Sequence, residues 1–331
     1  MNDSEIFKQN ILEFNKQLNP AVITSANLET LAGSAPDAIV MVGMGGSGTP
    51  GSILQNILDY AIVPIPVLTW KDGGLPALGG CAKNPLYLFV SFSGNTRETL
   101  DSFTKAVSKK ALVAVVAGGG ILLEYAQNAG LAYATFAQGA LHPRQAYGLT
   151  LYASLIILKS VFPRLTIPDL SAQIDPRQFA SRAEQIAARI VGKTTLVYTT
   201  QSLSHLGQIF KISIAESGKS PAFANMIPEV NHNELNILET RPRNLFALLV
   251  ASEREYSERT AEFELTTQIL GEYGVASETL QIPGQTPLHI TANAIAAAQW
   301  LGYQVALKTG RNPLGLEVVN KIKDLAKQKG L

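Results

Sequence analysis

Residues 86–99 read LYLFVSFSGNTRET and indicate the fold class of this chain. The first five residues are continuously apolar, which is typical of a parallel strand buried on both faces of a sheet. Four hydroxyl side chains follow around a Gly-Asn turn, where we expect a helix to begin. A buried strand that leads through a polar turn into a helix is the repeating unit of α/β folds, which bind ligands at such turns.

The same alternation of short apolar runs and helix-length segments continues on both sides of this stretch. In the first half we expect strands at 38–43, 66–70, 112–116 and 132–136 and a buried helix at 146–161. In the second half we expect strands at 195–199, 244–252 and 277–282, helices at 202–216, 257–273 and 289–307, and an amphipathic tail at 316–329. The pattern predicts parallel sheets flanked by helices, with one fold used twice.

Length and composition favour a globular chain of two domains. With 331 residues the chain suits two ordinary domains, and the proline-containing stretch 162–175 resembles a linker between them. We therefore expect domains at residues 1–165 and 166–331. The hydrophobic fraction is 46% and the charged fraction 16%, which is typical of well-buried sheets.

Charge and cysteine content exclude several classes of partner. The net charge is +1, from 27 basic and 26 acidic residues, so no field of one sign attracts nucleic acid or a membrane surface. Cys81 is the only cysteine, which excludes an intrachain disulfide and any multi-cysteine metal site. No signal peptide and no apolar run of spanning length are present, so we expect a cytoplasmic protein.

The glycine-rich stretch GMGGSG at 43–48 follows the first expected strand. Glycines let backbone amides converge on an anion, so we predict that Gly46 and Ser47 bind a phosphate at the start of a helix. The spacing also fits the G-x-G-x-x-G dinucleotide fingerprint. The next expected strand does not end in an acidic residue, and Asp72 comes late for a ribose contact.

The hydroxyl cluster at 91–99 strengthens the phosphate interpretation. Ser91, Ser93 and Thr96 can each donate to a phosphate oxygen, while the helix N-terminus adds amides and a favourable dipole. The alternative is that Thr96 only caps the helix and Thr99 is solvated.

At this point the sequence resembles a known family. Residues 91–99 are similar to the signature loop of SIS (sugar isomerase) domains, which are flavodoxin-like α/β units that bind phosphosugars. Residues 43–48 narrow the resemblance to the bifunctional phosphoglucose/phosphomannose isomerases, which carry two SIS domains. The resemblance runs from about 39 to 239 and implies a parallel sheet flanked by helices in each domain.

The base that such an isomerase needs is implied to be Glu216. A carboxylate at a helix end against apolar neighbours can have a raised pKa and act as a general base. The segment 211–219 resembles the family's glutamate segment, but Ala215 and Ser217 stand where the family usually has asparagines. The alternative is a surface carboxylate that ends a helix.

His232 lies between Asn231 and Asn233, and asparagine side chains at such positions can orient an imidazole. The segment is similar to the family's Asn-His-Asn-Glu motif, whose histidine assists ring opening. The resemblance further implies a homodimer in which the neighbouring subunit supplies this histidine. The alternative is a structural histidine.

Two cations complete the predicted site. Arg144 follows the last strand of the first half and can stabilise an enediolate, as the family's Pro-Arg does; the alternative is an interdomain salt bridge. His142 has no family counterpart and is expected to be structural. Related enzymes place a lysine on the C-terminal helix, for which we choose Lys327. The other tail lysines, which compete for this role or form a solvated face, are Lys321, Lys323 and Lys329.

The resemblance implies reversible conversion of glucose 6-phosphate to fructose 6-phosphate in glycolysis and gluconeogenesis, with mannose 6-phosphate also accepted. The reaction would pass through a cis-enediol. His232 and Glu234 are too sparse for a metal site, so we expect no metal and no cofactor. The alternatives are an isomerase of another phosphosugar and an SIS-type phosphosugar-binding regulator, although the sequence has no helix-turn-helix or basic patch for DNA.

Overall fold

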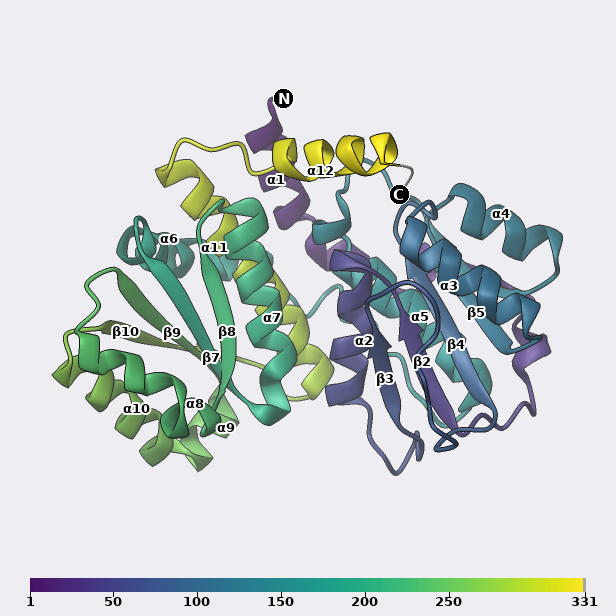
Figure 1. The fold of residues 1–331 in the computed structure, drawn as a ribbon, viewed down its shortest axis with the longest axis horizontal. Helices are drawn as coiled ribbons and strands as arrows, with labels where there is room; N and C mark the ends of the chain where they lie inside the picture. The colour runs from purple at the N-terminus through teal and green to yellow at the C-terminus, as the bar shows by residue number, and fades with distance from the viewer. Residues whose placement is uncertain (330–331) are drawn as a thin grey trace.

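The computed structural model describes residues 1–329, which form two parallel sheets, each flanked by helices (Figure 1). The first sheet has the strand order β1-β6-β5-β4-β2-β3, in which only β1 is antiparallel to its neighbour. Its strands are β1 (Ile23–Ala26), β2 (Ala38–Val42), β3 (Val67–Trp70), β4 (Pro85–Ser91), β5 (Leu112–Ala117) and β6 (Ala132–Phe136). The predicted α/β class is confirmed.

The helices of the first half cover both faces of this sheet because its central strands are apolar on both sides. They are α2 (Gly45–Ile57), α3 (Arg97–Ser108), α4 (Gly120–Asn128) and α5 (Tyr147–Val161), and α1 (Asp3–Leu12) precedes them. α5 is apolar around most of its circumference and is almost entirely buried, as predicted for 146–161.

The second sheet is fully parallel, with the order β10-β9-β7-β8. Its strands are β7 (Thr194–Thr200), β8 (Ala222–Ile227), β9 (Leu245–Ser252) and β10 (Ala276–Ile282). The helices are α6 (Ala180–Ile190), α7 (Ser204–Ile212), α8 (Glu229–His232), α9 (Glu253–Glu258), α10 (Thr260–Glu272), α11 (Pro287–Lys308) and α12 (Glu317–Gln328). Within the described part of the chain, every helix is too short or too polar to cross a membrane.

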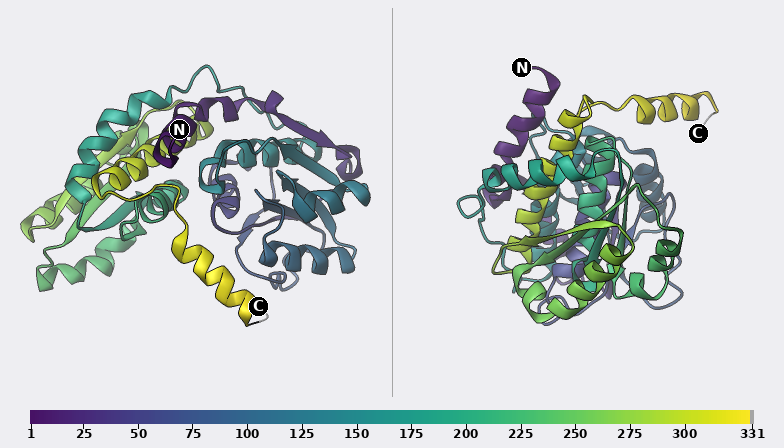
Figure 2. Two further views of the ribbon diagram at one scale, coloured as in Figure 1. Left: turned by 90° about the horizontal axis from the view of Figure 1, so that it is seen from above. Right: turned by 90° about the vertical axis from the view of Figure 1, so that its left-hand side faces the viewer.

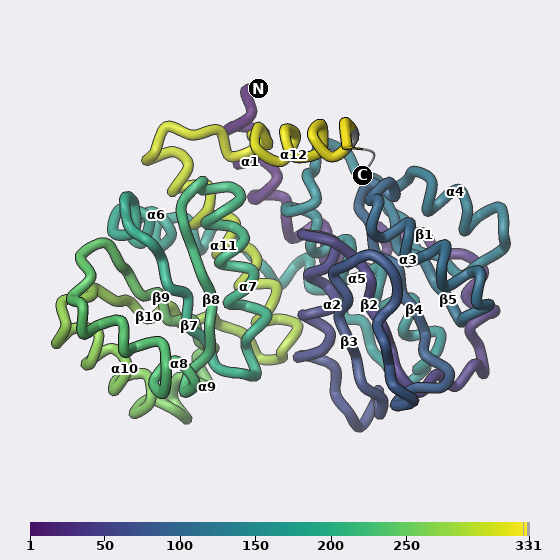
Figure 3. The backbone as a smooth tube through the Cα atoms, viewed as in Figure 1, coloured from purple at the N-terminus to yellow at the C-terminus, as the bar shows by residue number. Residues whose placement is uncertain are grey.

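The two halves meet along a seam at which α2 lies beside α7 (Figure 3). The N-terminal helix α1 packs on α11 of the second half, where the rings of Phe7 and Tyr303 stack at 6.0 Å. The irregular stretch 162–175 connects α5 to α6, and the division at 165 and 166 stays a prediction.

Two predicted helices differ from those observed. The segment 202–216 is not one α-helix, because α7 ends at Ile212 and the chain continues as a π-helix over Ser213–Ser217. The segment 257–273 is divided at Arg259 into α9 and α10. The edge strand β8 was not expected, because its residues AFANMI lack a run of β-branched side chains.

Candidate active site

The two predicted phosphate loops lie side by side at the carboxyl ends of β2 and β4, which are neighbours in the sheet. The Phe92 amide donates a hydrogen bond to the Ser47 hydroxyl oxygen at 2.9 Å, which ties one loop to the other. A Cβ atom at Gly43 would lie 2.7 Å from the Val90 carbonyl oxygen, so only glycine allows this approach. The loops can therefore act on one ligand together.

The hydroxyl oxygens of the second loop accept hydrogen bonds from the loop itself. Ser91 Oγ accepts from the Gly94 amide at 3.1 Å and lies 3.0 Å from Thr96 Oγ1. Ser93 Oγ accepts from the Asn95 amide at 3.2 Å. Each of these hydroxyls keeps its O–H group as a possible donor to a ligand, apart from the one shared between Ser91 and Thr96.

The helices that follow these loops begin without a side-chain cap. Thr96 occupies the N-cap position of α3, but its hydroxyl pairs with Ser91 and does not cap the helix, so the capping alternative is wrong. α2 also lacks a side-chain cap at Met44. Uncapped helix N-termini present amides and a positive dipole, which suit an anion.

A third loop, after β5, supports the second phosphate loop and was missed in the sequence. Gly94 has φ +69°, and a Cβ atom there would lie 1.7 Å from the carbonyl oxygen of Gly119. The Gln138 side-chain amide donates to the Phe92 carbonyl oxygen at 2.8 Å. The glycine run at 118–120, directly after an expected strand, is the sequence signal that could have identified this support.

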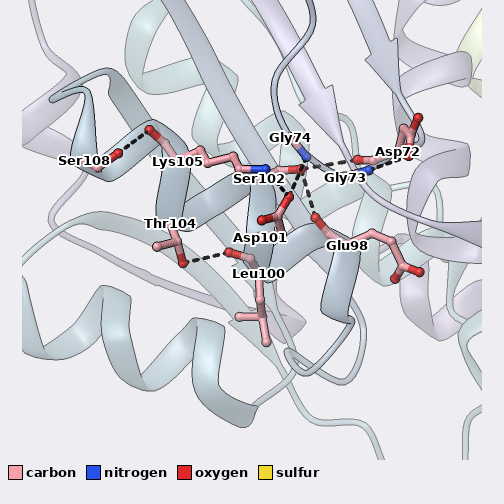
Figure 4. A network of polar contacts seen from close by, with 10 residues as sticks. All are labelled: Asp72, Gly73, Gly74, Glu98, Leu100, Asp101, Ser102, Thr104, Lys105 and Ser108. Atoms are coloured by element: carbon pink, nitrogen blue, oxygen red, sulfur yellow. Dashed lines mark hydrogen bonds and ion pairs between the residues drawn. The ribbon is translucent and has the colours of Figure 1, made fainter. Parts of the chain in front are cut away.

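Asp72, the acid considered for a dinucleotide site, is directed at its own loop (Figure 4). Its carboxylate accepts from the Gly73 amide at 2.7 Å, and its carbonyl oxygen accepts from the Ser102 hydroxyl at 3.2 Å. The neighbouring Gly74 amide donates to Asp101 at 2.7 Å. These contacts anchor the loop on α3, and Asp72 is already engaged there.

An ion pair across the seam joins Arg144 to Glu216. Arg144 precedes α5 and is only 3% exposed; its Nη1 donates to Glu216 Oε1 at 3.0 Å, and its Nη2 donates to the Pro313 carbonyl oxygen at 2.7 Å. A Cβ atom at Gly46 would lie 2.8 Å from the carbonyl oxygen of Pro143, so the first phosphate loop touches this segment. The structure brings Gly46, Arg144 and Glu216 together, and the salt bridge considered as the alternative for Arg144 is present.

Glu216 is held by the π-helix Ser213–Ser217, which packs closely on α11. A Cβ atom at Gly302 of α11 would lie 2.4 Å from the Ser213 carbonyl oxygen and 3.2 Å from Ser217 Cβ. Ser217 is therefore buried against α11 in a space that suits a small side chain. Single π-helical turns occur frequently at functional sites, and here the turn presents a partly exposed carboxylate.

Two side chains near this ion pair were not predicted to take part. The Tyr147 hydroxyl is fully buried and has no hydrogen-bond partner among the described residues. Burial and the nearby Glu216 carboxylate raise the pKa of Tyr147 above its usual value. Burial and the Arg144 guanidinium lower the pKa of His142, against the opposite effect of Asp3 and Glu216. His142 thus lies within electrostatic range of the site.

His232 does not lie near Glu216 in the same chain. Glu216 precedes the amino end of β8, whereas His232 follows its carboxyl end, and the six residues of the strand span about 20 Å. The imidazole is exposed. The side-chain oxygens of both flanking asparagines have other partners: Asn231 accepts from Thr266 at 3.2 Å, and Asn233 accepts from the Glu234 amide. That the asparagines orient the imidazole stays a prediction.

A cavity of about 420 Å³ opens beside Glu216 and is lined in part by Lys219, Arg311 and Val318. α12 begins at this cavity and projects from the two sheets (Figure 2). Lys327 lies in α12, but its side chain is outside the part of the structure that is described. No group of three or more metal-ligating side chains occurs among residues 1–329.

Comparison with known proteins identifies relatives that match both halves. Residues 179–325 match the model of the bacterial phospho-glucose isomerase C-terminal SIS domain. A bifunctional phosphoglucose/phosphomannose isomerase of Aquifex aeolicus is 28% identical over 292 residues, which cover 88% of this chain and 90% of the relative. The enzyme of the same name from Caldicellulosiruptor bescii is 30% identical over 243 residues, covering 68% and 70%.

The fold of the chain is also similar to that of a solved phosphosugar isomerase. The crystal structure of tagatose-6-phosphate ketose/aldose isomerase from Escherichia coli superposes with a TM-score of 0.63 at 15% identity, covering 93% of this chain and 94% of the other. The observed fold has the features expected of this family: two sheets flanked by helices, and two predicted phosphate loops in contact. The chain belongs to the bifunctional phosphoglucose/phosphomannose isomerase family.

Proposed function

We propose that the chain is a metal-independent aldose–ketose isomerase that interconverts glucose 6-phosphate and fructose 6-phosphate, and also accepts mannose 6-phosphate. The observation that carries this proposal is the meeting of the Glu216 carboxylate and the Arg144 guanidinium beside the Gly46 loop. A base and a cation stand next to an anion-binding loop, as isomerisation of a phosphosugar requires. The family relatives carry both activities in their names.

The phosphate binds between the two loops in this mechanism. The hydroxyls of Ser47, Ser91, Ser93 and Thr96 and the amides that open α2 and α3 hold it. Fixing the phosphate positions the far end of the open-chain sugar toward the seam, where Glu216 lies.

Glu216 then removes a proton from the carbon next to the carbonyl group and returns it to the neighbouring carbon. The C–H electron pair becomes the C=C bond of a cis-enediolate. The hydroxyl proton on the carbon that lost its hydrogen passes to the former carbonyl oxygen, so that a new carbonyl group forms there when Glu216 returns its proton, and the two oxygens carry the negative charge in turn. Arg144 stabilises that charge. Rotation about C2–C3 in the open-chain intermediate presents either face of C2 to the same base, which accounts for both epimers.

Ring opening requires a second proton relay, for which we propose His232 of a second copy in a homodimer. The separation of about 20 Å along β8 supports this assignment, because one chain alone does not bring His232 to Glu216. Two large apolar side chains on this part of the second half are exposed: Phe223 on the edge strand β8 at 61% and Ile237, five residues after His232, at 41%, which suits a covered surface. Cytoplasmic location and a place in glycolysis stay predictions.

The dimer is tested by mixing two inactive variants, Glu216→Gln and His232→Ala, under conditions that exchange subunits. If each site takes residues from two chains, mixed dimers regain one intact site, and random pairing restores about a quarter of wild-type activity. Each variant mixed with itself is the control. No recovery, with exchange demonstrated by a tagged subunit, would show that His232 acts within its own chain or not at all.

The function is tested by offering the purified chain fructose 6-phosphate, glucose 6-phosphate, mannose 6-phosphate and a panel of pentose and heptose phosphates, with and without a chelator. We expect conversion among the three hexose phosphates at rates that the chelator does not change. Conversion of only a pentose or heptose phosphate would assign a different isomerase. Binding of phosphosugars without any conversion would favour the regulator.

A further inference from the structure

Lys219 places an ammonium group beside Glu216, and the mechanism above does not use it. It follows the π-helix after one residue, Gly218, and lines the 420 Å³ cavity together with Glu216. Its Nζ donates to the Glu216 carbonyl oxygen and, at 2.6 Å, to the Gly315 carbonyl oxygen. An ammonium group has three N–H donors, so one remains for a ligand in the cavity.

The charge of Lys219 is not neutralised by an acid in direct contact. Among the described residues, Lys219 forms no ion pair, and both of its acceptors are neutral carbonyl groups. The Glu216 carboxylate is instead paired with Arg144, whose second nitrogen is held by the Pro313 carbonyl oxygen. Lys219 is therefore a cation at this cavity that is ready for a new negative charge. Arg311 also lines the cavity, but Lys219 is the cation whose ammonium group is bonded to the Glu216 backbone.

The backbone of Lys219 has a strained conformation, and such conformations occur most often at functional sites. Its φ is +54°, in the left-handed region that residues with a Cβ atom rarely adopt. Lys110, at the end of α3 opposite the phosphate loop, has nearly the same φ of +53°. Lys110 therefore provides a matched position for separating the effect of backbone strain from an effect on the site.

Burial and the Arg144 guanidinium lower the pKa of Lys219, and Glu216 and Glu317 act in the opposite direction. Arg144, Lys219 and Glu216 thus lie within electrostatic range of one another. This arrangement agrees with a substrate oxygen binding between them.

We propose that Lys219 is a catalytic residue that contacts the substrate, with its third N–H bonded to the O1 or O2 oxygen of the open-chain sugar. The bond strengthens as the carbonyl electron pair moves onto that oxygen, and no proton leaves the lysine. Arg144 can then keep part of its ion pair with Glu216 until the carboxylate takes up the proton. This inference rests on the proposed isomerase function and assigns the cation that the tail lysines were expected to supply.

The test is Lys219→Asn, because asparagine tolerates the left-handed region and removes the ammonium group. We expect a Tm equal to or above that of the wild type and a kcat for fructose 6-phosphate about 10²-fold lower, in the range seen when one oxyanion donor is removed. Inhibition by inorganic phosphate should be unchanged, while binding of 5-phosphoarabinonate, whose carboxylate resembles the enediolate, should weaken at least tenfold. Lys110→Asn should match the Tm change and leave kcat unaltered.

A kcat for Lys219→Asn within threefold of the wild type would overturn the inference and leave the isomerase function intact. A lower Tm with an unchanged kcat per folded molecule would also overturn it, since Lys219 would then only stabilise the fold through its two bonds to backbone carbonyl oxygens. Lys219→Arg, which keeps the charge, should recover part of kcat, and equal loss in both variants would also contradict a role for the charge. A wild-type chain without isomerase activity would refute the proposed function itself.

Discussion

The close approach of the phosphate loop at Gly94 to the third loop gives a quantitative prediction for Gly94→Ala. The new methyl group would lie 1.7 Å from the backbone carbonyl oxygen of Gly119, and no side-chain rotation relieves that contact. The left-handed φ of +69° adds about 1–2 kcal/mol, and overpacking adds about 1–3 kcal/mol. We expect the free energy of unfolding to fall by about 2–5 kcal/mol in total.

Gly45→Ala is the matched control, because Gly45 has φ +52° but a Cβ atom there would meet no other atom within 4 Å. It lies in the other phosphate loop and should lose only the left-handed contribution of about 1–2 kcal/mol. Both variants are compared with the wild type by urea unfolding, and KM for fructose 6-phosphate reports on the loop. If Gly94→Ala is no less stable than Gly45→Ala, the reasoning about this contact is refuted.

Two further predictions concern the second half. In Gly302→Ala the new methyl group should contact the Ser213 carbonyl oxygen and displace the π-helix. We expect the free energy of unfolding to fall by about 1–3 kcal/mol, and kcat to change more than KM. An unchanged kcat would contradict the role given to this contact. His205 is buried with Nε2 3.0 Å from the Thr291 hydroxyl, and burial lowers its pKa from 6.5 to about 4. The unfolded chain therefore binds a proton below pH 6.5 that the folded chain does not bind until about pH 4. As the pH is lowered from 6.5 to about 4, the free energy of unfolding should fall by at most about 3 kcal/mol. Urea unfolding at several pH values checks this, and an equal slope in His205→Gln would show that another group is responsible.

Most of the fold follows from local sequence pattern. The buried strands were predicted nearly to their observed ends, because β4, β5 and β6 are short apolar runs bounded by turns. β8 was not predicted, since an edge strand half exposed to solvent carries no continuous apolar signal. The π-helix was not predicted either, because its residues suit an α-helix equally well and its close packing on Gly302 comes from a helix far along the chain.

The chemistry of the site could be predicted only in part from the sequence. Hydroxyl and glycine clusters indicate an anion site by residue type alone, and Ser47 does contact the second loop. The pairing of Arg144 with Glu216 joins positions 72 residues apart across the seam, which no local pattern encodes. Lys219 was not singled out because its importance depends on a strained backbone and on the position of Gly315.

The central claim is that Glu216 transfers the proton, and one measurement tests it most directly. The initial rate of conversion of fructose 6-phosphate to glucose 6-phosphate is compared between the wild type and Glu216→Gln, with a chelator present. Glutamine keeps the shape and the acceptor oxygen for Arg144 but cannot accept the proton. We predict a kcat lower by about 10²- to 10⁴-fold with KM changed little. A Glu216→Gln variant that retains a kcat near that of the wild type would contradict the mechanism.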